Sequence, residues 1–430
     1  MNLSRRTLLL AALVVLAGIA GQWLGTPWDG VWRYPAVLLA GALVLEAVLT
    51  ARTGVTASVS PGRAARLGET FSVTLELGTA APRPLRVEVA PDLPALAPEQ
   101  VPPAMLVCRR DAPAALRLRL SPARLGAHRW PPVPARVLGP LGLAWWPRRL
   151  DVREVLRVMP GRLATRVARG ARAGGRQAGG RSGEGLELRG LRDYRAGDPV
   201  RRIDWKVSAR RGRTVVREYE DDARLSAMIL LDAGRTSSLQ SGRLSRLGHY
   251  VNAAARLAEL AARGGDEIGL VVFAAQPLAV LPPRAGTAAL ARMHRILQTL
   301  DSRSEDGNPL PAAVQVARVT PRRSLVLLLT DLDEADAGGQ IGRAVRLLGR
   351  QHLTLVGALR DPELDRLRRR PAESRMDPYA SLAALGLEET ERDNQLALAR
   401  LGAQVVRAPP ASLEAALMRR YALLRRRRAV

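Results

Sequence analysis

The sequence predicts an α/β + β protein made of a two-helix transmembrane hairpin, a small β-sandwich and a doubly wound, mostly parallel sheet. Three observations predict this fold class. Two apolar runs lie near the N-terminus, short stretches of alternating polar and apolar residues follow them, and apolar strands then alternate with helical segments. The 430 residues suffice for two or three domains, and a hydrophobic share of 47% excludes a mostly disordered chain.

The two apolar runs are each long enough to cross a bilayer. Residues 8–24 follow Arg5 and Arg6, and residues 34–49 are closed by Arg52. About 17 helical residues just cross a hydrocarbon core roughly 30 Å thick. Positive charge lies mainly on the outer flanks of the pair, so the positive-inside rule places both termini in the cytoplasm. Residues 1–53 are therefore predicted to form a transmembrane helical hairpin.

A cleaved export signal is the alternative interpretation of the first apolar run. Residues 4–9 read Ser-Arg-Arg-Thr-Leu-Leu, which is similar to a twin-arginine signal. The hairpin is favoured because it explains both apolar runs at once, whereas a cleaved signal leaves the second run without a role.

Residues 54–160 are predicted to form the β-sandwich. Polar and apolar side chains alternate in residues 71–77, 85–89 and 116–120, and prolines and glycines separate these runs. Alternation with a period of two is typical of half-buried antiparallel strands. Nothing in this part suggests catalysis, so we expect it to be structural or to form an interaction surface.

Residues 161–223 are predicted to be a linker followed by a densely charged segment. Residues 170–185 are rich in glycine and arginine, without the glycine spacing of a phosphate-binding loop. In residues 191–210 acids and arginines interleave, and Gly-Asp-Pro at 197–199 predicts a turn. We interpret this segment as a loop that arginine–carboxylate pairs hold in one shape, with Ile203 and Trp205 as packing anchors.

Residues 224–430 alternate between apolar strands and helices. Strands are expected over residues 227–231, 268–273, 278–281, 324–329, 353–359 and 404–407, and helices over 244–262, 288–300, 312–319, 381–401 and 412–424. This order predicts a mostly parallel sheet with helices on both faces. Ligands of such sheets bind beyond the C-terminal ends of the strands.

Two carboxylates stand at that predicted edge. Asp232 follows the first strand directly, and Asp331 follows the strand over residues 324–329. If the two strands are neighbours, both acids converge on one crevice with Thr236 nearby. Oxygen ligands of this kind suit Mg²⁺. The alternative is that both acids cap helices or turn the chain, which aspartate often does.

These residues resemble a known family. Asp232 to Thr236 and Thr330-Asp331 are similar to the von Willebrand factor A domain, in which a D-x-S-x-S loop and a later aspartate form a metal-ion-dependent adhesion site. The whole chain resembles the bacterial membrane proteins grouped as domain of unknown function 58. The residues that carry this resemblance are Tyr194, Gly197, Asp198, Arg201, Ile203, Asp204, Trp205, Ala209 and Arg210, with residues 139–143, 232–235 and 329–332.

The resemblance implies a degenerate adhesion site. Gly234 stands where the first metal-binding serine is expected and Thr236 where the second is, and residues 306–311 hold no threonine. A site of this kind would bind Mg²⁺ weakly, through Asp232, Thr236, Asp331 and water. Recognition of a partner without metal is the equal alternative.

The function that the resemblance implies is that of an adaptor at the bacterial inner membrane, with most of the chain in the cytoplasm. Members of the family are similar to proteins encoded beside MoxR-type AAA+ ATPases, so such an ATPase is the expected partner, and no catalytic residue is predicted. Two alternatives stay open. One is a metal-dependent hydrolase using Asp198, Asp204 or Asp232, although no nucleophile–base pair is evident. The other is a protein that binds a polyanion or a lipid surface, suggested by the net charge of +26.

A run of arginines lies near the C-terminus, and the chain has few cysteine and histidine residues. Arg425, Arg426, Arg427 and Arg428 are expected either to meet anionic lipid or to complement a helix C-terminus. One cysteine, Cys108, excludes an internal disulfide framework, and four scattered histidines argue against a His/Cys zinc enzyme.

Overall fold

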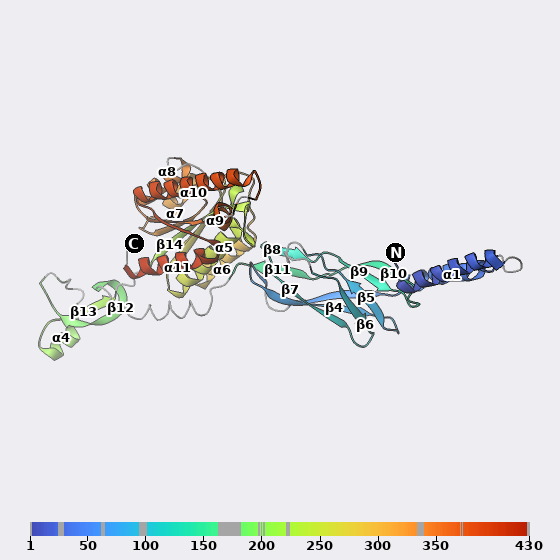
Figure 1. Ribbon diagram of the computed structural model, residues 1–430. Helices are drawn as coiled ribbons and strands as arrows, with labels where there is room; N and C mark the ends of the chain where they lie inside the picture. Colours follow the sequence, from blue (N-terminus) through green and yellow to red (C-terminus); the bar gives the residue numbers. More distant parts are fainter. Residues whose placement is uncertain are drawn as a thin grey trace. The chain divides into compact units, whose positions relative to one another are not determined.

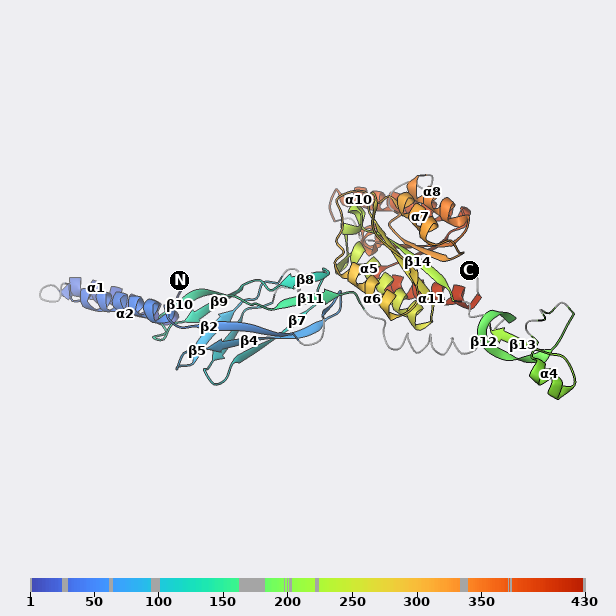
Figure 2. The ribbon, with the colours of Figure 1, turned by 180° about the vertical axis from the view of Figure 1, so that it is seen from behind.

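The structure is a computed structural model that divides into two compact units, Met1–Pro160 and Gly161–Val430 (Figures 1 and 2). It describes residues 2–24, 30–61, 65–93, 101–161, 182–196, 198, 200, 203–220, 224–332, 339–369, 371 and 373–427. The predicted division into four parts, at residues 53, 160 and 223, is finer than these two units.

The first unit begins with two apolar helices, α1 (Arg5–Leu24) and α2 (Arg33–Ala51). Both are long enough to cross a membrane, and their most apolar windows have mean hydropathies of 2.1 and 1.8. Most of their leucine and valine side chains are exposed, as expected of a surface that faces lipid. Two N-terminal apolar helices were predicted, and the structure confirms them.

The strands of the first unit form three sheets within its described residues. Their bounds are β1 (Asn2–Leu3), β2 (Val55–Pro61), β3 (Ala65–Arg66), β4 (Phe71–Thr79), β5 (Leu85–Val89), β6 (Ala104–Cys108), β7 (Ala114–Leu120), β8 (Gly126–Arg129), β9 (Val133–Leu138), β10 (Ala144–Leu150) and β11 (Val155–Met159). The sheet orders are β1-β10-β9-β5-β6, β2-β4-β7 and β3-β11-β8. All pairs are antiparallel except β3 with β11.

Period-two alternation sets which strand residues are buried. In β4 every second residue from Val73 to Thr79 is buried, and β5 and the end of β7 follow the same rule. The predicted strand at residues 85–89 coincides with β5, and those at 71–77 and 116–120 lie within β4 and β7. The core of this unit is therefore built mainly from inward-facing leucines and valines, since the chain has few aromatic residues.

Polar groups of the helical hairpin hold the turn between β9 and β10. Both carboxylate oxygens of Glu46 on α2 accept the backbone N–H of Leu143 at 3.1 Å, and Glu46 is fully buried. From the N-terminal side, the Ser4 hydroxyl donates to the Gly142 carbonyl at 2.7 Å, and the Thr7 hydroxyl donates to the Leu143 carbonyl. A side chain at Gly139 would overlap the Glu46 carboxylate, so a larger residue there would displace that carboxylate from Leu143.

Two further contacts join the hairpin to β10. Strand β1 pairs antiparallel with the start of β10, with Asn2 opposite Trp145. Near the C-terminal end of α2, the Thr50 carbonyl accepts Nη2 of Arg148 at 2.6 Å. Within the first unit, residues before α1 and at the end of α2 therefore contact the same strand.

The second unit contains a mixed sheet whose order is β18-β17-β14-β19-β20-β21. Its strands are β14 (Ser226–Asp232), β17 (Glu267–Phe273), β18 (Pro277–Arg284), β19 (Leu325–Leu329), β20 (Leu353–Leu359) and β21 (Gln404–Ala408). Neighbouring strands are parallel, except that β18 runs antiparallel to β17. The predicted mostly parallel sheet is thus present. Asp232 ends β14, and Asp331 follows the adjacent strand β19.

Helices cover both faces of this sheet (Figures 1 and 2). They are α5 (Arg246–Arg263), α6 (Thr287–Gln298), α7 (Pro309–Val319), α8 (Gln340–Gly349), α9 (Pro362–Arg369), α10 (Asp377–Arg400) and α11 (Pro410–Arg427), with a short 3-10 turn, η2 (Arg235–Ser238), and a two-stranded turn of β15 (Gln240–Ser241) and β16 (Leu244–Ser245). Helices α7 and α8 and Leu398 of α10 pack on one face through a core that includes Met228, Leu230 and Val345.

The charged segment forms a small motif of its own. Strand β12 (Ser182–Asp193) pairs antiparallel with β13 (Val215–Glu220), and helix α4 (Trp205–Arg211) precedes β13. The end of the predicted linker, residues 182–185, lies in β12, whereas residues 170–181 lie outside the described residues. Helices α4, α8 and α9 were not predicted. They are 7, 10 and 8 residues long, so each is shorter than three turns and offers little sequence over which a helical pattern can be recognised.

Candidate functional site

Asp232, the first predicted site residue, ends β14 and is only 2% exposed. Its Oδ1 accepts the backbone N–H of Gly234 at 2.8 Å, and its Oδ2 accepts the hydroxyl of Thr330 at 2.6 Å. The backbone of Gly307 lies against the same carboxylate, so closely that a Cβ there would overlap it. The chain itself therefore closes this edge of the sheet over Asp232.

Asp331, the second predicted site residue, has a buried cationic partner. Nη1 of Arg246, at the start of α5, lies 3.3 Å from its Oδ1, and both side chains are less than one-tenth exposed. The phenol of Tyr250 donates to the same oxygen at 2.6 Å. Burial, followed by the nearby Asp331 charge, raises the pKa of Tyr250 well above its ordinary value, so the phenol stays a donor.

Tyr250 also joins the ends of two parallel strands, β19 and β20. Its hydroxyl lies 3.2 Å from the carbonyl oxygen of Thr330, which follows β19, and accepts the backbone N–H of Leu359 at the end of β20. Neither Arg246 nor Tyr250 was predicted as a site residue. The signal that could have found them is local: Ser245 caps α5, and residues 246 and 250 are one helical turn apart on the same face.

In their present arrangement, the oxygen atoms of Asp232 and Asp331 do not form a site that fits a divalent cation. Both oxygens of Asp232 accept protein hydrogen bonds, and the Arg246 guanidinium already supplies positive charge beside Asp331. Thr236 is half-buried in η2, and the hydroxyl that reaches Asp232 is that of Thr330. Among the described residues, no three His, Cys, Asp or Glu side chains gather as a metal-binding group. Binding of Mg²⁺ to Asp232, Thr236 and Asp331 stays a prediction.

The charged motif is held by arginine–carboxylate pairs, as predicted. Arg192 makes a two-pronged contact with Asp198, with both N–O distances at 2.7 Å, and the backbone N–H of Arg195 adds a third bond at 2.8 Å. Asp204 caps α4 through the N–H of Val207 and pairs with Nε of Arg217 at 2.9 Å. These contacts are those of structural acids, whereas the hydrolase alternative assigns catalysis to Asp198 and Asp204.

Asp198 provides a pH-dependent test of this motif. The Arg192 hydrogen bonds, followed by the N–H of Arg195, lower the pKa of Asp198 from 3.8 to about 2. The folded motif thus favours the ionised acid, and its stabilising contribution is complete above pH 3.8 and is lost as the pH falls toward about 2. We expect hydrogen exchange of residues 191–196, 198, 203 and 204, corrected for intrinsic rates, to accelerate over this interval. The Asp198→Asn variant should exchange fast already at pH 5, and equal protection in the variant would contradict the assignment.

Trp205 was predicted to pack the motif from within, but 66% of its surface is exposed, so it is not a packing anchor. Ile203 does contact the strand layer, through a bridge to Val216. Val200 is 64% exposed and Tyr194 is 39% exposed. Since arginine–carboxylate pairs fix the backbone, these apolar side chains are presented to solvent on a rigid support.

The structure describes only some of the remaining predicted motif residues. Ala209 and Arg210 lie on the exposed side of α4. Gly197 and Arg201 lie outside the described residues. The unpredicted neighbours Lys206 and Arg211 are also exposed, so the surface that carries Trp205 is basic.

The C-terminal arginines have different environments. Arg425 binds inside the second unit: its Nε lies 2.8 Å from Asp266, and its Nη2 donates to the Gly264 carbonyl just after α5. It therefore complements a helix C-terminus, that of α5 rather than its own. Arg426 is exposed, the Arg427 side chain is not described, and Arg428 lies outside the described residues.

Comparison with curated proteins finds weak sequence similarity. The chain is 26% identical over 184 residues to the uncharacterized protein Mb1516 of Mycobacterium bovis and to the uncharacterized protein Rv1480 of Mycobacterium tuberculosis. The match spans 42% of this chain and 56% of each relative, so the chain matches just over half of the length of these proteins.

Comparison with solved structures and with family models gives two further results. The crystal structure of the CARDB domain of the PF1109 protein from Pyrococcus furiosus, in complex with di-metal ions, is similar over 25% of this chain and 93% of its own, at 9% identity. Its TM-score of 0.18 is too low to support an argument. The family of proteins of unknown function DUF58 matches residues 190–371, which include the charged motif, Asp232, Arg246 and Asp331.

Proposed function

We propose that this chain is a membrane-tethered, non-enzymatic interaction protein whose partner contact is the exposed face of the β12–α4–β13 motif. One observation carries the proposal: salt bridges fix the backbone of this motif while Trp205 stays 66% exposed. Interface hot spots are enriched in tryptophan, tyrosine and arginine, and a rigid support lowers the entropy cost of binding.

The tether of this proposal is the α1–α2 hairpin in a bacterial inner membrane, with the rest of the chain in the cytoplasm. The contacts of Ser4, Thr7 and β1 with the β9–β10 turn support a hairpin that is kept. A cleaved signal would remove all three contacts. Together with the hydrogen bond from Arg148 to Thr50, they bring the residues before α1 and the last turn of α2 to the same strand, β10, which supports a hairpin that crosses the membrane twice.

We further propose that the second unit has a von Willebrand factor A-like fold and that its partner is a MoxR-type AAA+ ATPase. The strand order, the antiparallel edge strand β18 and the helices on both faces support the fold (Figure 1). The partner follows from the resemblance to the family. Because Asp232 and Asp331 are buried and bonded within the chain, the exposed motif is the better candidate for the contact.

A pull-down with matched variants tests this function. The full chain, solubilised in detergent from its own cells after cross-linking, is compared with Trp205→Ala and with Tyr379→Ala. Tyr379 is a similarly exposed aromatic residue on α10, at 68% exposure. We expect an AAA+ ATPase to be enriched with the wild-type chain, to be retained by Tyr379→Ala, and to fall by about tenfold or more with Trp205→Ala, as for a hot-spot residue.

Two results would contradict the proposal. Equal recovery with Trp205→Ala and wild type would show that the motif is not the contact. If only the Asp232→Asn variant loses the ATPase, at fixed Mg²⁺, the partner contact would be the edge of the sheet at Asp232 rather than the motif.

A further inference from the structure

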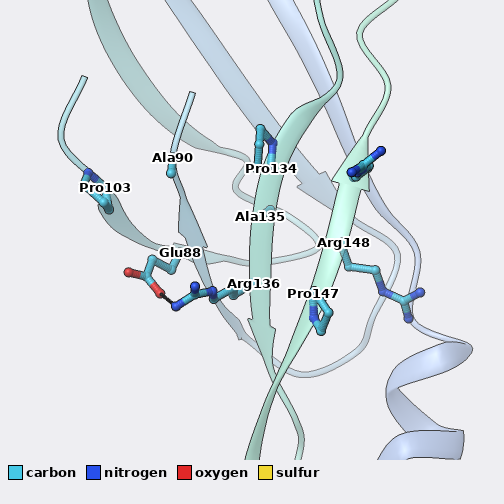
Figure 3. Close-up of a pocket in the computed structure, with 9 residues that line it drawn as sticks. Glu88, Ala90, Pro103, Pro134, Ala135, Arg136, Pro147 and Arg148 are labelled. Atoms are coloured by element: carbon cyan, nitrogen blue, oxygen red, sulfur yellow. Dashed lines mark ion pairs between the residues drawn. The ribbon is translucent and has the colours of Figure 1, made fainter. Parts of the chain in front are cut away.

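A cavity of about 460 Å³ lies on the face of the β5–β9–β10 sheet in the first unit (Figure 3). Its apolar lining comes from Ala90, Ala135, Pro103, Pro134 and Pro147. Its polar lining consists of three arginines, at positions 136, 148 and 149, and Glu88. The volume falls within the range of small-ligand sites. Because the Arg148 guanidinium donates to Thr50, the cavity's own cationic groups are those of Arg136 and Arg149, against the single carboxylate of Glu88.

The strand register explains why these side chains meet. On β9 and β10, Arg136 is opposite Pro147 and Pro134 is opposite Arg149, so the four residues share one face of the sheet. Prolines beside both arginines supply a flat apolar surface. The lining therefore combines cationic donors with apolar walls.

The cavity carries an excess of positive charge, because Glu88 does not neutralise its arginines. Glu88 lies 3.9 Å from Arg136, and that arginine side chain is 54% exposed. A contact this long and this exposed to water is weak. Guanidinium groups bind phosphate oxygens through paired N–H donors, so the cavity suits a phosphate group.

The cavity is also close to the end of the apolar hairpin. Arg148 lines the cavity and donates to the carbonyl of Thr50, in the last turn of α2. Figure 3 shows Arg148 extending toward a helix at the edge of the cavity. If α2 crosses a membrane, its last turn lies at the level of the lipid headgroups, and so does Arg148.

We propose that this cavity binds the phosphate headgroup of an anionic phospholipid, with Arg136 and Arg149 holding the phosphate and the prolines contacting the adjoining glycerol. The proposal rests on the membrane tether proposed above. It would couple the β region of the first unit to anionic lipid at a defined site rather than through diffuse charge.

Native mass spectrometry of the full chain tests the proposal. The chain is incubated in detergent with an equimolar mixture of phosphatidylglycerol and phosphatidylcholine of identical acyl chains, and the retained lipid is identified. We expect phosphatidylglycerol to predominate with the wild-type chain. The preference should fall by about five-fold for each arginine removed in Arg136→Gln/Arg149→Gln.

Matched variants separate a site from net charge and from misfolding. Arg117→Gln/Arg119→Gln removes the same charge from exposed positions of β7 and should keep the preference. Glu88→Gln removes the acid of the cavity and should strengthen phosphatidylglycerol binding, a gain that misfolding cannot produce. Equal preference in the Arg136/Arg149 variant and wild type, or equal loss in the β7 control, would overturn the proposal.

A final arm distinguishes the source of the phosphate. Displacement of the lipid by millimolar inorganic phosphate would overturn the lipid assignment in favour of a soluble anion. Recovery of each variant in the membrane fraction is measured first, so a failed tether is separated from an incorrect headgroup assignment.

Discussion

Replacing Arg246 by methionine is expected to destabilise the second unit by about 3–5 kcal/mol, because it leaves the Asp331 carboxylate buried without its cation. The loss should be concentrated where Tyr250 and Asp331 join β19 and β20. Native-state hydrogen exchange of the β14, β19 and β20 amides measures it directly. This readout is preferable to one melting temperature, since a chain of two units need not unfold in a single transition.

Two control variants sharpen this result. Tyr250→Phe removes only hydrogen bonds and should cost less, about 1–3 kcal/mol. Arg292→Met, at an exposed position of α6, should change local stability by no more than about 0.5 kcal/mol. If Arg246→Met and Arg292→Met have the same effect, the buried ion pair does not hold this edge of the sheet.

Restoring the missing serine, by Gly234→Ser, is expected to destabilise the same edge without creating a Mg²⁺ site. A Cβ at residue 234 would lie 2.6 Å from the backbone nitrogen of Gly307, closer than real packing allows. Overpacking of this kind costs about 1–3 kcal/mol. We expect weaker protection of the residue 232 to 239 backbone, and no added protection when Mg²⁺ is raised to millimolar levels.

The control for this substitution is Gly386→Ser on α10, where a Cβ meets no atom within 4 Å. Its effect should be small, within about 0.5 kcal/mol. Stabilisation of Gly234→Ser by Mg²⁺ would contradict the expected result. It would mean that the loop at residues 305–308 opens to admit a cation.

The elements that could be predicted from the sequence are those in which burial imposes a periodic pattern. The predicted strands at residues 85–89 and 353–359 coincide with β5 and β20, because alternating or continuous apolar residues mark one or two buried faces. Helix α9 was missed because most of its residues are charged and none is buried. Its position depends on tertiary contacts, which local periodicity does not record.

The candidate site was predicted in its position but not in its chemistry. The parallel order of β14 and β19 placed Asp232 and Asp331 at one edge, as the strand pattern implied. The partners of those acids come from distant segments: Arg246 lies 85 residues before Asp331, and Gly307 lies 75 residues after Asp232. Such pairings depend on how α5 and the 305–308 loop pack. The local sequence places Arg246 in the first turn of α5, but it does not show that this turn meets Asp331.

The hydrogen bonds from Glu46, Ser4 and Thr7 to the β9–β10 turn have a consequence for N-terminally truncated versions of the chain. A version that begins at residue 54 loses β1 and leaves the start of β10 as an open sheet edge. It also leaves the Leu143 N–H without its carboxylate acceptor. Open edges invite pairing between chains. Deleting the apolar helices to gain solubility is therefore expected to promote aggregation instead. The α1–α2 hairpin is better kept as part of the folded first unit.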